Sequence, residues 1–221
     1  MMRPVLLLLL TSCATTGSVK PGINDAFLAQ RSVQAWQGRF EVESREIWTE
    51  REHIVDAIGV FRGADVADVG AGTGFIARML ADRVGALGRV YAVDLMAYFV
   101  SHIRDMARAN GRNNLVAIQC TERSIALPQH SVDIVFTCDT YHHFEYPSQS
   151  LASIWNALRP GGRLVVVDFI RIPGVSRPFV IGHVRAGEEV VTREIEEAGF
   201  EKVGENRFLQ ENYILHFRKK M

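Results

Sequence analysis

The sequence predicts an α/β fold in which helices cover both faces of a seven-stranded, mostly parallel sheet. Strand-like and helix-like segments alternate from about residue 40 onward, which is typical of βαβ crossovers. The run Val132–Cys138 is almost wholly apolar, as in a strand that is buried on both faces. At roughly 150 residues per domain, 221 residues predict a single domain. We place this domain at residues 23–221, after an N-terminal segment of residues 1–22.

Five segments have apolar residues three and four positions apart, the spacing of a helix with one buried face. They are residues 43–58, 74–84, 96–109, 147–158 and 188–198. Helix-stopping residues follow four of them, namely Gly59, Asn110-Gly111, Pro160-Gly161-Gly162 and Gly199.

Strands are expected where short apolar runs lie between these helices or after the last one. They are residues 66–69, 89–94, 115–119, 132–138, 164–169, 200–203 and 213–217. Because helices separate most of these runs, the strands are expected to pair mainly in parallel.

The composition excludes several classes of protein. Hydrophobic residues make up 48% of the chain and charged residues 23%, as in globular proteins rather than disordered ones. Lys+Arg and Asp+Glu are 25 each, so no net positive field favours nucleic acid as a partner. Cys13, Cys120 and Cys138 are too few for a disulfide scaffold, and Cys120 and Cys138 are expected to be small core residues. No run of 18 apolar residues occurs beyond the N-terminus, which excludes a polytopic membrane protein.

The N-terminus has the pattern of a secretory signal peptide. Arg3 precedes the apolar run Val5–Leu10, and Leu10-Thr11-Ser12-Cys13 resembles a bacterial lipobox. This resemblance implies a membrane-anchored lipoprotein of the cell envelope, tethered through a lipidated Cys13, with residues 14–22 as a flexible tether. The alternative is a plain extension or a misassigned start, with a cytoplasmic domain.

A glycine-rich loop is the most informative segment of the sequence. The strand 66–69 leads into Gly70-x-Gly72-x-Gly74, and a helix begins at once. Such a turn lets a ligand approach the backbone, and N–H groups at the helix start favour an anionic group. Asp94 ends the second strand 20 residues after Gly74, where a carboxylate can accept hydrogen bonds from both ribose hydroxyls. Together these features predict a nucleoside-type ligand.

The glycine spacing separates two families that share this plan. Dinucleotide oxidoreductases have their third glycine three positions after the second, which here is Phe75. Asp68-x-Gly70-x-Gly72-x-Gly74 instead resembles motif I of class I S-adenosylmethionine-dependent methyltransferases. Further matches run over about residues 41–217: Leu127-Pro128, Ser131–Val135, Leu158–Leu164, Ala198-Gly199-Phe200, and Tyr141-His142-His143-Phe144, a signature of one small subgroup.

The resemblance implies a Rossmann-like, doubly wound sheet, with the C-terminal segment adding an antiparallel strand at its edge. It implies S-adenosyl-L-methionine as the cofactor, bound by Asp68, Gly70, Ala71, Gly72, Thr73, Gly74, Asp94, Leu95, Met96, Thr121, Glu122 and Asp139. In many relatives Gly-Asp-Ala precedes the Leu-Pro, and its Asp contacts the adenine amino group. Here the stretch is Cys120–Ser124, and Glu122 is the candidate for that contact.

Methyl transfer requires little covalent help from the protein, since alignment of nucleophile and methyl supplies much of the rate. The segment 139–143 follows the fourth strand, so it is expected at the carboxyl ends of the strands, where ligands of such sheets bind. We expect His142 or His143 to act as a base or to orient the substrate, and Tyr141 to shape the methyl site. For each, packing in the core is the alternative.

Other polar residues could also face this pocket, among them Asp168, His183 and Arg185. His142, His143 and Glu145 raise the question of a metal ion. Adjacent histidines seldom converge on one ion when the chain is extended, so no metal is expected.

The sequence thus predicts a methyltransferase that acts on a small-molecule acceptor. One alternative is a non-catalytic module that binds S-adenosylmethionine or S-adenosylhomocysteine. A dinucleotide oxidoreductase is disfavoured by the glycine spacing.

Overall fold

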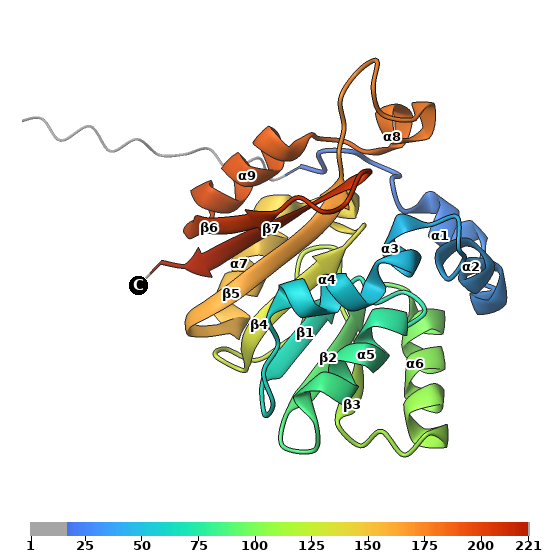
Figure 1. Cartoon of the computed structure of the whole chain (residues 1–221), viewed down its shortest axis with the longest axis vertical. Coiled ribbons are helices and arrows are strands. Elements are labelled where there is room, and N and C mark those ends of the chain that lie inside the picture. Colours follow the sequence, from blue (N-terminus) through green and yellow to red (C-terminus); the bar gives the residue numbers. More distant parts are fainter. Residues whose placement is uncertain (1–16, 221) are drawn as a thin grey trace, which may run out of the picture.

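The computed structural model describes residues 17–220 (Figure 1). Its seven strands form one sheet in the order β3-β2-β1-β4-β5-β7-β6. The strands are β1 (Asp65–Val69), β2 (Arg89–Asp94), β3 (Leu115–Gln119), β4 (Val132–Cys138), β5 (Leu158–Phe169), β6 (Phe200–Asn206) and β7 (Asn212–Lys219). The predicted α/β fold class with a mostly parallel seven-stranded sheet is therefore confirmed.

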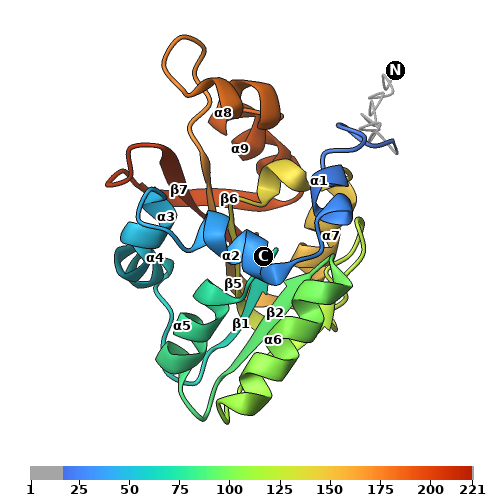
Figure 2. The same ribbon diagram turned by 90° about the vertical axis from the view of Figure 1, so that its right-hand side faces the viewer.

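Two packed layers of helices cover the sheet, one on each face (Figures 1 and 2). The helices are α1 (Asp25–Ala29), α2 (Val33–Phe40), α3 (Glu46–Thr49), α4 (Arg51–Ile58), α5 (Phe75–Val84), α6 (Ala97–Ala109), α7 (Pro147–Ala157), α8 (Pro178–His183) and α9 (Glu188–Glu197), with a 3₁₀ turn, η1 (Tyr141–His143). On one face, Ile54, Leu80 and Ile103 of α4, α5 and α6 share a core with the strands. On the other, Leu151 of α7 and Ile195 of α9 do the same.

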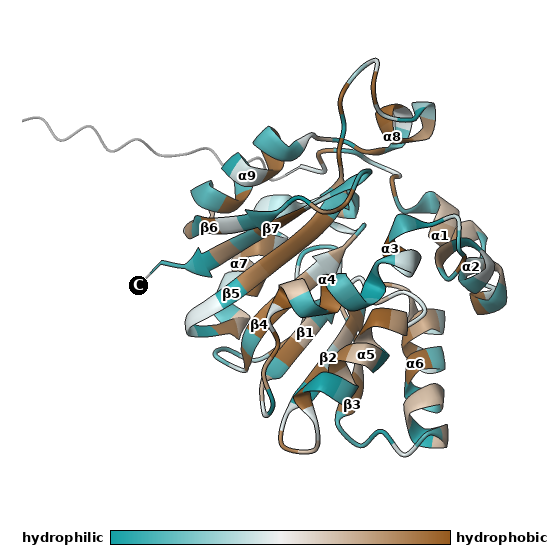
Figure 3. Ribbon diagram, viewed as in Figure 1, coloured by the Kyte–Doolittle hydropathy of each residue, from teal (hydrophilic) through white to brown (hydrophobic). Residues whose placement is uncertain are grey.

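The central strands carry apolar residues on both faces, which explains their continuous apolar sequence. Figure 3 shows brown, hydrophobic segments along the middle of the sheet. Along β4, Ile134 and Phe136 belong to the core under α4, α5 and α6, whereas Val135 belongs to the core under α7 and α9. Successive side chains of a strand point to opposite faces, so both cores need apolar residues from the same strand.

The C-terminal strand β7 is antiparallel to both β5 and β6. The sequence places an antiparallel strand at the sheet edge, but β7 lies one position inside it, and β6 is the outermost strand. The β6–β7 hairpin joins the sheet through β7, which pairs with β5 on its other side. Its residues Tyr213, Leu215 and Phe217 are fully buried, as an inner position requires.

Several expected elements differ in their limits. The helix expected over 43–58 is two helices, α3 and α4, and the Arg51 guanidinium donates to the Trp48 carbonyl at their junction. The strand expected to begin at 164 begins at Leu158, which pairs with Val132, and the register shifts across Pro160-Gly161-Gly162 before Arg163 pairs with Ile134. The helices α1, α2 and α8 were not expected from the sequence.

The segment before α1 contacts the rest of the domain. The Val19 N–H donates to the Glu145 carbonyl (2.8 Å), and Ser18 Oγ donates to the Glu145 carboxylate (2.7 Å). The expected flexible tether of residues 14–22 is therefore docked at Ser18 and Val19. The signal-like run and Cys13 lie outside the described residues. Within residues 17–220, no helix is both long and apolar enough to cross a membrane.

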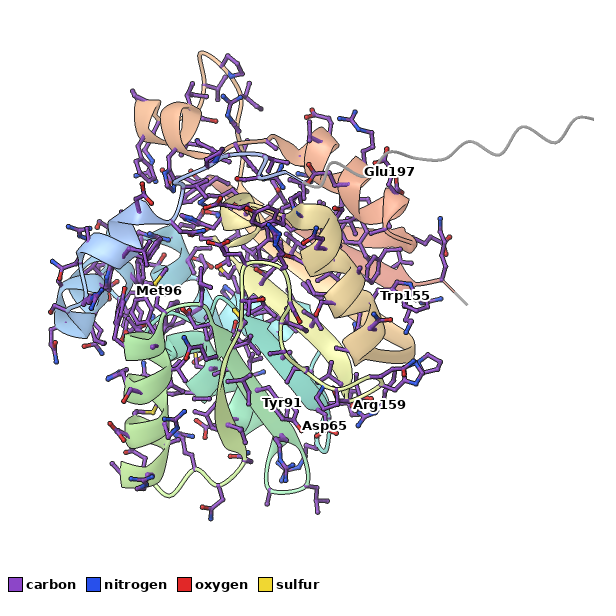
Figure 4. The ribbon with its side chains drawn as sticks, turned by 180° about the vertical axis from the view of Figure 1, so that it is seen from behind. Asp65, Tyr91, Met96, Trp155, Arg159 and Glu197 are labelled. Carbon is purple, nitrogen blue, oxygen red and sulfur yellow. The ribbon has the colours of Figure 1, made fainter. Side chains whose placement is uncertain are left out.

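The two ends of the sheet have different roles. At the amino ends of β1 and β4, Arg159 pairs with Asp65 (2.7 Å) and Asp133 (2.8 Å). Figure 4 shows Asp65 and Arg159 together at this end, far from Met96. The chain reverses its strand order between β1 and β4, and ligands of such sheets bind beyond the carboxyl ends of the strands at that point.

Candidate functional site

The glycine loop after β1 is fixed by the strand beside it. The N–H groups of Gly70 and Ala71 both donate to the Val93 carbonyl of β2 (2.8 and 3.1 Å). The N–H of Gly72 donates to Asp94 Oδ2, and the N–H of Met96 donates to Asp94 Oδ1, each at 2.8 Å. One carboxylate at the end of β2 thus ties the loop to the start of α6, and each oxygen keeps a lone pair for a ligand.

Two buried carboxyl groups lie below this loop. Asp68 and Asp94 are 3% and 6% exposed. Burial raises the pKa of Asp68 to about 7, and the nearby Asp94 charge raises it further. Burial raises the pKa of Asp94 to about 6, although its backbone hydrogen bonds act in the opposite direction. Carboxyl groups whose pKa is raised this far by burial are typical of ligand sites.

The buried polar atoms at this position fit S-adenosylmethionine. Asp68 Oδ2 and Thr73 Oγ1 are buried and have no hydrogen-bond partner among the described residues. Buried polar groups are nearly always paired, so both atoms indicate an absent polar ligand. A molecule with ribose hydroxyls and an amino-acid group would supply partners for Asp94 and for Asp68.

Gly70 must be glycine for two reasons. Its φ is +79°, in the left-handed region, and a Cβ there would lie 2.2 Å from Cγ2 of Thr140. The Thr140 hydroxyl donates to the Cys138 carbonyl (2.9 Å), so the side chain is held against the loop. The glycine loop after β1 and the segment after β4 are therefore packed against each other.

Apolar side chains from the N-terminal helices cover the loop. Phe27 and Phe40 each stack on Trp36, and the three rings pack with Leu95 and Met96. Figure 2 shows α1 and α2 crossing above the strand ends, and Figure 4 places Met96 beneath them. The sequence prediction missed these aromatic residues, although Val33, Trp36 and Phe40 have the spacing of one helix face.

A cavity of about 440 Å³ opens between this cover and the strand ends. Of the expected site residues, those that line it are Asp68, Gly70, Ala71, Gly72, Thr73, Asp94, Leu95, Met96, Thr121, Glu122, Asp139, His142 and His143. Gly74 does not line the cavity. It is the N-cap of α5, with φ +78°, and a Cβ there would lie 2.9 Å from Ile103.

Asp139 is held by residues that the sequence did not indicate. Its carboxylate accepts hydrogen bonds from Arg45 and from Asn212 Nδ2 (2.6 Å). Its φ is +48°, an uncommon conformation outside glycine. Burial raises its pKa to about 6, and the Arg45 charge lowers it. Arg45 and Asn212 come from distant parts of the chain, so no local motif could identify them.

Tyr141 does not reach the cavity, contrary to the expectation that it shapes the methyl site. Its side chain is fully buried on the other face of the sheet, under α7 and α9. Its hydroxyl donates to Glu194 Oε2 (2.8 Å), and Arg185 pairs with the same carboxylate at 2.9 and 2.7 Å. Because η1 is a helical turn, Tyr141 and His142 point to different sides, and Tyr141 and Arg185 act as core residues.

His142 is oriented by Asp168, the residue near the end of β5. The Nδ1 atom of His142 donates to Asp168 Oδ1 (2.7 Å), and the His142 N–H donates to Oδ2 (3.0 Å). Because a carboxylate accepts, this bond places the proton of a neutral ring on Nδ1 and leaves Nε2 free. Both side chains are almost wholly buried, at 3% and 1% exposure.

Three histidines meet at this end of the cavity. One ring nitrogen from each of His142, His143 and His183 lies within 4.8 Å of the others. The Nε2 atoms of His143 and His183 are 3.3 Å apart. The sequence argument against a metal assumed an extended chain, and that premise is wrong because residues 141–143 form a 3₁₀ turn. Glu145 is not part of the cluster and instead accepts from Ser18.

The histidines differ from free imidazole in basicity. Burial, together with the neighbouring His142, His183 and Lys20, lowers the pKa of His143 to about 2. Burial likewise lowers the pKa of His183 to about 4. The expected base that titrates near neutrality is therefore not His143, whose ring is neutral at physiological pH.

Comparison with known proteins agrees with this geometry. A family profile described as a methyltransferase domain matches residues 67–166. The ubiquinone/menaquinone biosynthesis C-methyltransferase UbiE of Hahella chejuensis is 30% identical over 132 residues, which are 58% of this chain and 53% of that protein. The same enzyme of Laribacter hongkongensis is 29% identical over 126 residues, 57% and 50% of the two chains. The chain spans about half the length of these curated relatives.

Solved structures share the fold. A crystal structure of a SAM-dependent methyltransferase from Aquifex aeolicus superposes with a TM-score of 0.74 at 24% identity, covering 83% of this chain and 97% of that one. A possible exported protein from Bordetella parapertussis has a TM-score of 0.63 at 15% identity, covering 79% and 68%.

The match over residues 67–166 is thus to a methyltransferase domain, and the fold is that of solved S-adenosylmethionine-dependent methyltransferases. This match and the fold imply S-adenosylmethionine as the cofactor, which is also what the glycine loop and Asp94 predict.

Proposed function

We propose that this chain transfers the methyl group of S-adenosylmethionine to a small-molecule acceptor bound at the histidine end of the cavity. The single observation that carries the proposal is the continuity of this cavity. It begins at the glycine loop and Asp94 and ends at His142, His143 and His183. Donor and acceptor sites must adjoin for in-line transfer, because alignment is the main contribution that the protein makes.

Each group of residues has a role in this proposal. Asp94 holds the ribose hydroxyls while its backbone bonds keep the loop in place. Asp68 and Thr73 bind the amino-acid portion, directly or through water. Leu95 and Met96 pack against the adenine, and Thr121 and Glu122 lie at its edge of the cavity. The bound cofactor supplies an activated methyl group, and the chain aligns the acceptor with it.

A small acceptor is supported by the charge and by the lining of the cavity. The chain has equal numbers of basic and acidic residues, which gives no net attraction for nucleic acid. The cavity volume of about 440 Å³ falls among those of small-molecule sites. The UbiE relatives are named as C-methyltransferases of quinone biosynthesis, so ring compounds with hydroxyl or carbonyl groups are the first acceptors to try.

Calorimetric titration tests the cofactor site directly. S-adenosylhomocysteine should bind with micromolar affinity, and NAD should give no heat. If NAD bound and S-adenosylhomocysteine did not, the proposal would be wrong.

A transfer assay separates the enzyme from a non-catalytic binding module. The protein is incubated with S-adenosylmethionine that carries an isotopic methyl label and with small-molecule extracts, and products are identified by mass. The proposal predicts a labelled small molecule that is absent without the protein. Tight cofactor binding without any product across extracts and ring compounds would favour the module.

We also propose that the chain is tethered to a membrane through Cys13. The support is the lipobox-like sequence and the docking of Ser18 and Val19 on Glu145, which fixes where a tether would leave the domain. The full chain should fractionate with membranes, and Cys13→Ser should release it. A fully soluble wild-type protein would contradict the tether.

A further inference from the structure

We propose that His142, His143 and His183 bind one divalent transition-metal ion, with Zn²⁺ as the best-fitting candidate, at the acceptor end of the cavity. The three rings come from two separate segments, η1 and the end of α8. Their ring centroids lie 4.3, 4.9 and 5.2 Å apart in pairs, so each ring is next to both others. The metal site itself stands on this donor geometry alone.

One nitrogen–nitrogen distance in the cluster equals that expected around a tetrahedral ion. Zinc–nitrogen bonds of about 2.0–2.1 Å at a tetrahedral angle place two ligand nitrogens roughly 3.3–3.4 Å apart. The Nε2 atoms of His143 and His183 are 3.3 Å apart. A hydrogen bond between His143 and His183 would explain this distance equally well, but it would use only two of the three rings. An ion would use all three, because one ring nitrogen from each lies within 4.8 Å of the others.

Asp168 gives His142 the arrangement of a metal ligand. Metal-binding histidines usually donate their other ring nitrogen to a carboxylate, which orients the ring and raises its basicity. Nδ1 of His142 donates to Asp168 in this way, so Nε2 is the nitrogen available to an ion. Asp168 is itself held by the backbone N–H groups of His142 and Phe169, at 3.0 and 2.8 Å.

The other two ligands are held through their backbones and by aromatic rings. Asn24 Nδ2 donates to the His143 carbonyl (3.2 Å), and Lys20 Nζ donates to the carbonyls of Gly182 and His183. The charge of Lys20 is thus directed at carbonyl oxygens. Phe27 packs edge-on against His143, and Phe179 stacks on His183.

The donor set selects the kind of metal and its role. Imidazole nitrogens suit Zn²⁺, Cu²⁺, Ni²⁺ and Fe²⁺ rather than Mg²⁺ or Ca²⁺. Three protein ligands leave a coordination position open, as in catalytic zinc sites, and all three histidines line the cavity. That position would take a hydroxyl, thiol or carbonyl group of the acceptor, a role that rests on the proposed function.

Metal titration of the full-length protein tests the site. The protein is stripped with a chelator and titrated with Co²⁺, which reports tetrahedral coordination by its visible absorption, and with Zn²⁺ by calorimetry. One equivalent should bind with a four-coordinate Co²⁺ spectrum, which Zn²⁺ should displace. Asp168→Asn should weaken binding roughly 10–100-fold, as for other outer carboxylates, and His143→Ala or His183→Ala should weaken it more.

His53→Ala is the matched control, because His53 is exposed on α4 and distant in sequence from the cluster. It should bind metal as the wild type does. Circular dichroism identifies any variant that fails to fold, and His183, on the short helix α8, still tests the site if His143→Ala does not fold. The metal site would be disproved if the folded wild type bound no Co²⁺ or Zn²⁺, or if the histidine variants bound them equally well. S-adenosylhomocysteine titration of the same samples shows separately whether the cofactor site is intact.

Discussion

The two ends of the cavity are built in different ways. The cofactor end consists of residues 68–73, 94–96 and 121–122, which lie at or just after the carboxyl ends of three strands that are neighbours in the sheet. Backbone N–H groups and the Asp94 carboxylate set its shape. The histidine end consists of His142, His143, Asp168 and His183, and its contacts reach back to Asn24 and Lys20. The first end is thus a product of the sheet topology, whereas the second depends on side chains brought together over more than 100 residues.

Thr140 connects the two ends. It directly precedes η1, and its side chain fills the space beside Gly70. A change at Gly70 should therefore disturb both ends, unlike a change within either of them.

The largest effect is expected for Gly70→Ala. A left-handed alanine costs about 1–2 kcal/mol, and the overlap with Thr140 should add roughly 1–3 kcal/mol to the loss in unfolding free energy. Chemical denaturation gives the stability, and calorimetry with S-adenosylhomocysteine should show greatly weakened binding.

Gly111→Ala separates strain from overlap, because Gly111 has φ +62° and nothing within 4 Å of a Cβ. The unfolding free energy of this variant should fall only by the cost of a left-handed alanine, and its affinity for the cofactor should not change. An equal cost at the two glycines would show that Thr140 is not packed on the loop and that the two ends are not connected there.

The next largest effect is expected for Asp94→Ala, which acts on the cofactor end alone. It removes a charged acceptor from the ribose and leaves the N–H groups of Gly72 and Met96 without their partner. S-adenosylhomocysteine affinity should fall by about 1–3 kcal/mol, measured by calorimetry. The spectrum of Co²⁺ at the histidine end should not change. Unaltered cofactor affinity would mean that the ribose binds elsewhere.

The difference between the cofactor end and the histidine end also explains which features the sequence could predict. Strands β2, β3 and β4 have the predicted limits, and the glycine loop with Asp94 lies at the cavity, because local patterns determine these elements. Tyr141 takes the alternative position in the core, because the 3₁₀ turn directs its side chain away from the cavity that His142 lines. Arg45 and Asn212 meet at Asp139 only through tertiary packing, which leaves no local signal. The Tyr-His-His-Phe motif could be found, but its third partner, His183, lies 40 residues away.

A pH dependence should distinguish affinity from stability at Asp94. Its folded pKa of about 6 lies above the ordinary value of 3.8, so its contribution to stability is present below pH 4 and is lost as the pH rises through 6. Wild type should therefore lose stability from pH 4 to pH 7 through Asp94, whereas Asp94→Asn should not. The unfolding free energy of the variant minus that of wild type should rise over this range. Cofactor affinity should change in the opposite direction and weaken roughly tenfold from pH 7 to pH 5, since the carboxylate is the acceptor.

Because Asn does not titrate, the cofactor affinity of Asp94→Asn should depend less on pH than that of the wild type. Asp68, with a pKa of about 7, should leave a residual slope of the same sign in the variant. If the wild type and Asp94→Asn had identical affinity profiles, titration of Asp94 would not control cofactor binding.

The smallest effect is expected for Tyr141→Phe, which tests whether this motif residue belongs to the histidine end at all. The lost hydrogen bond to Glu194 should cost about 0.5–1.5 kcal/mol of unfolding free energy, since Arg185 still pairs with that carboxylate.

Tyr213→Phe is the matched control, because the Tyr213 hydroxyl is buried in the same core and has no partner in the described part of the chain. Removing it should leave stability unchanged or improved. Both variants should transfer methyl groups and bind S-adenosylhomocysteine as the wild type does. A slower transfer by Tyr141→Phe alone, with cofactor affinity intact, would place the Tyr141 hydroxyl at the acceptor and contradict the separation of the motif between core and cavity.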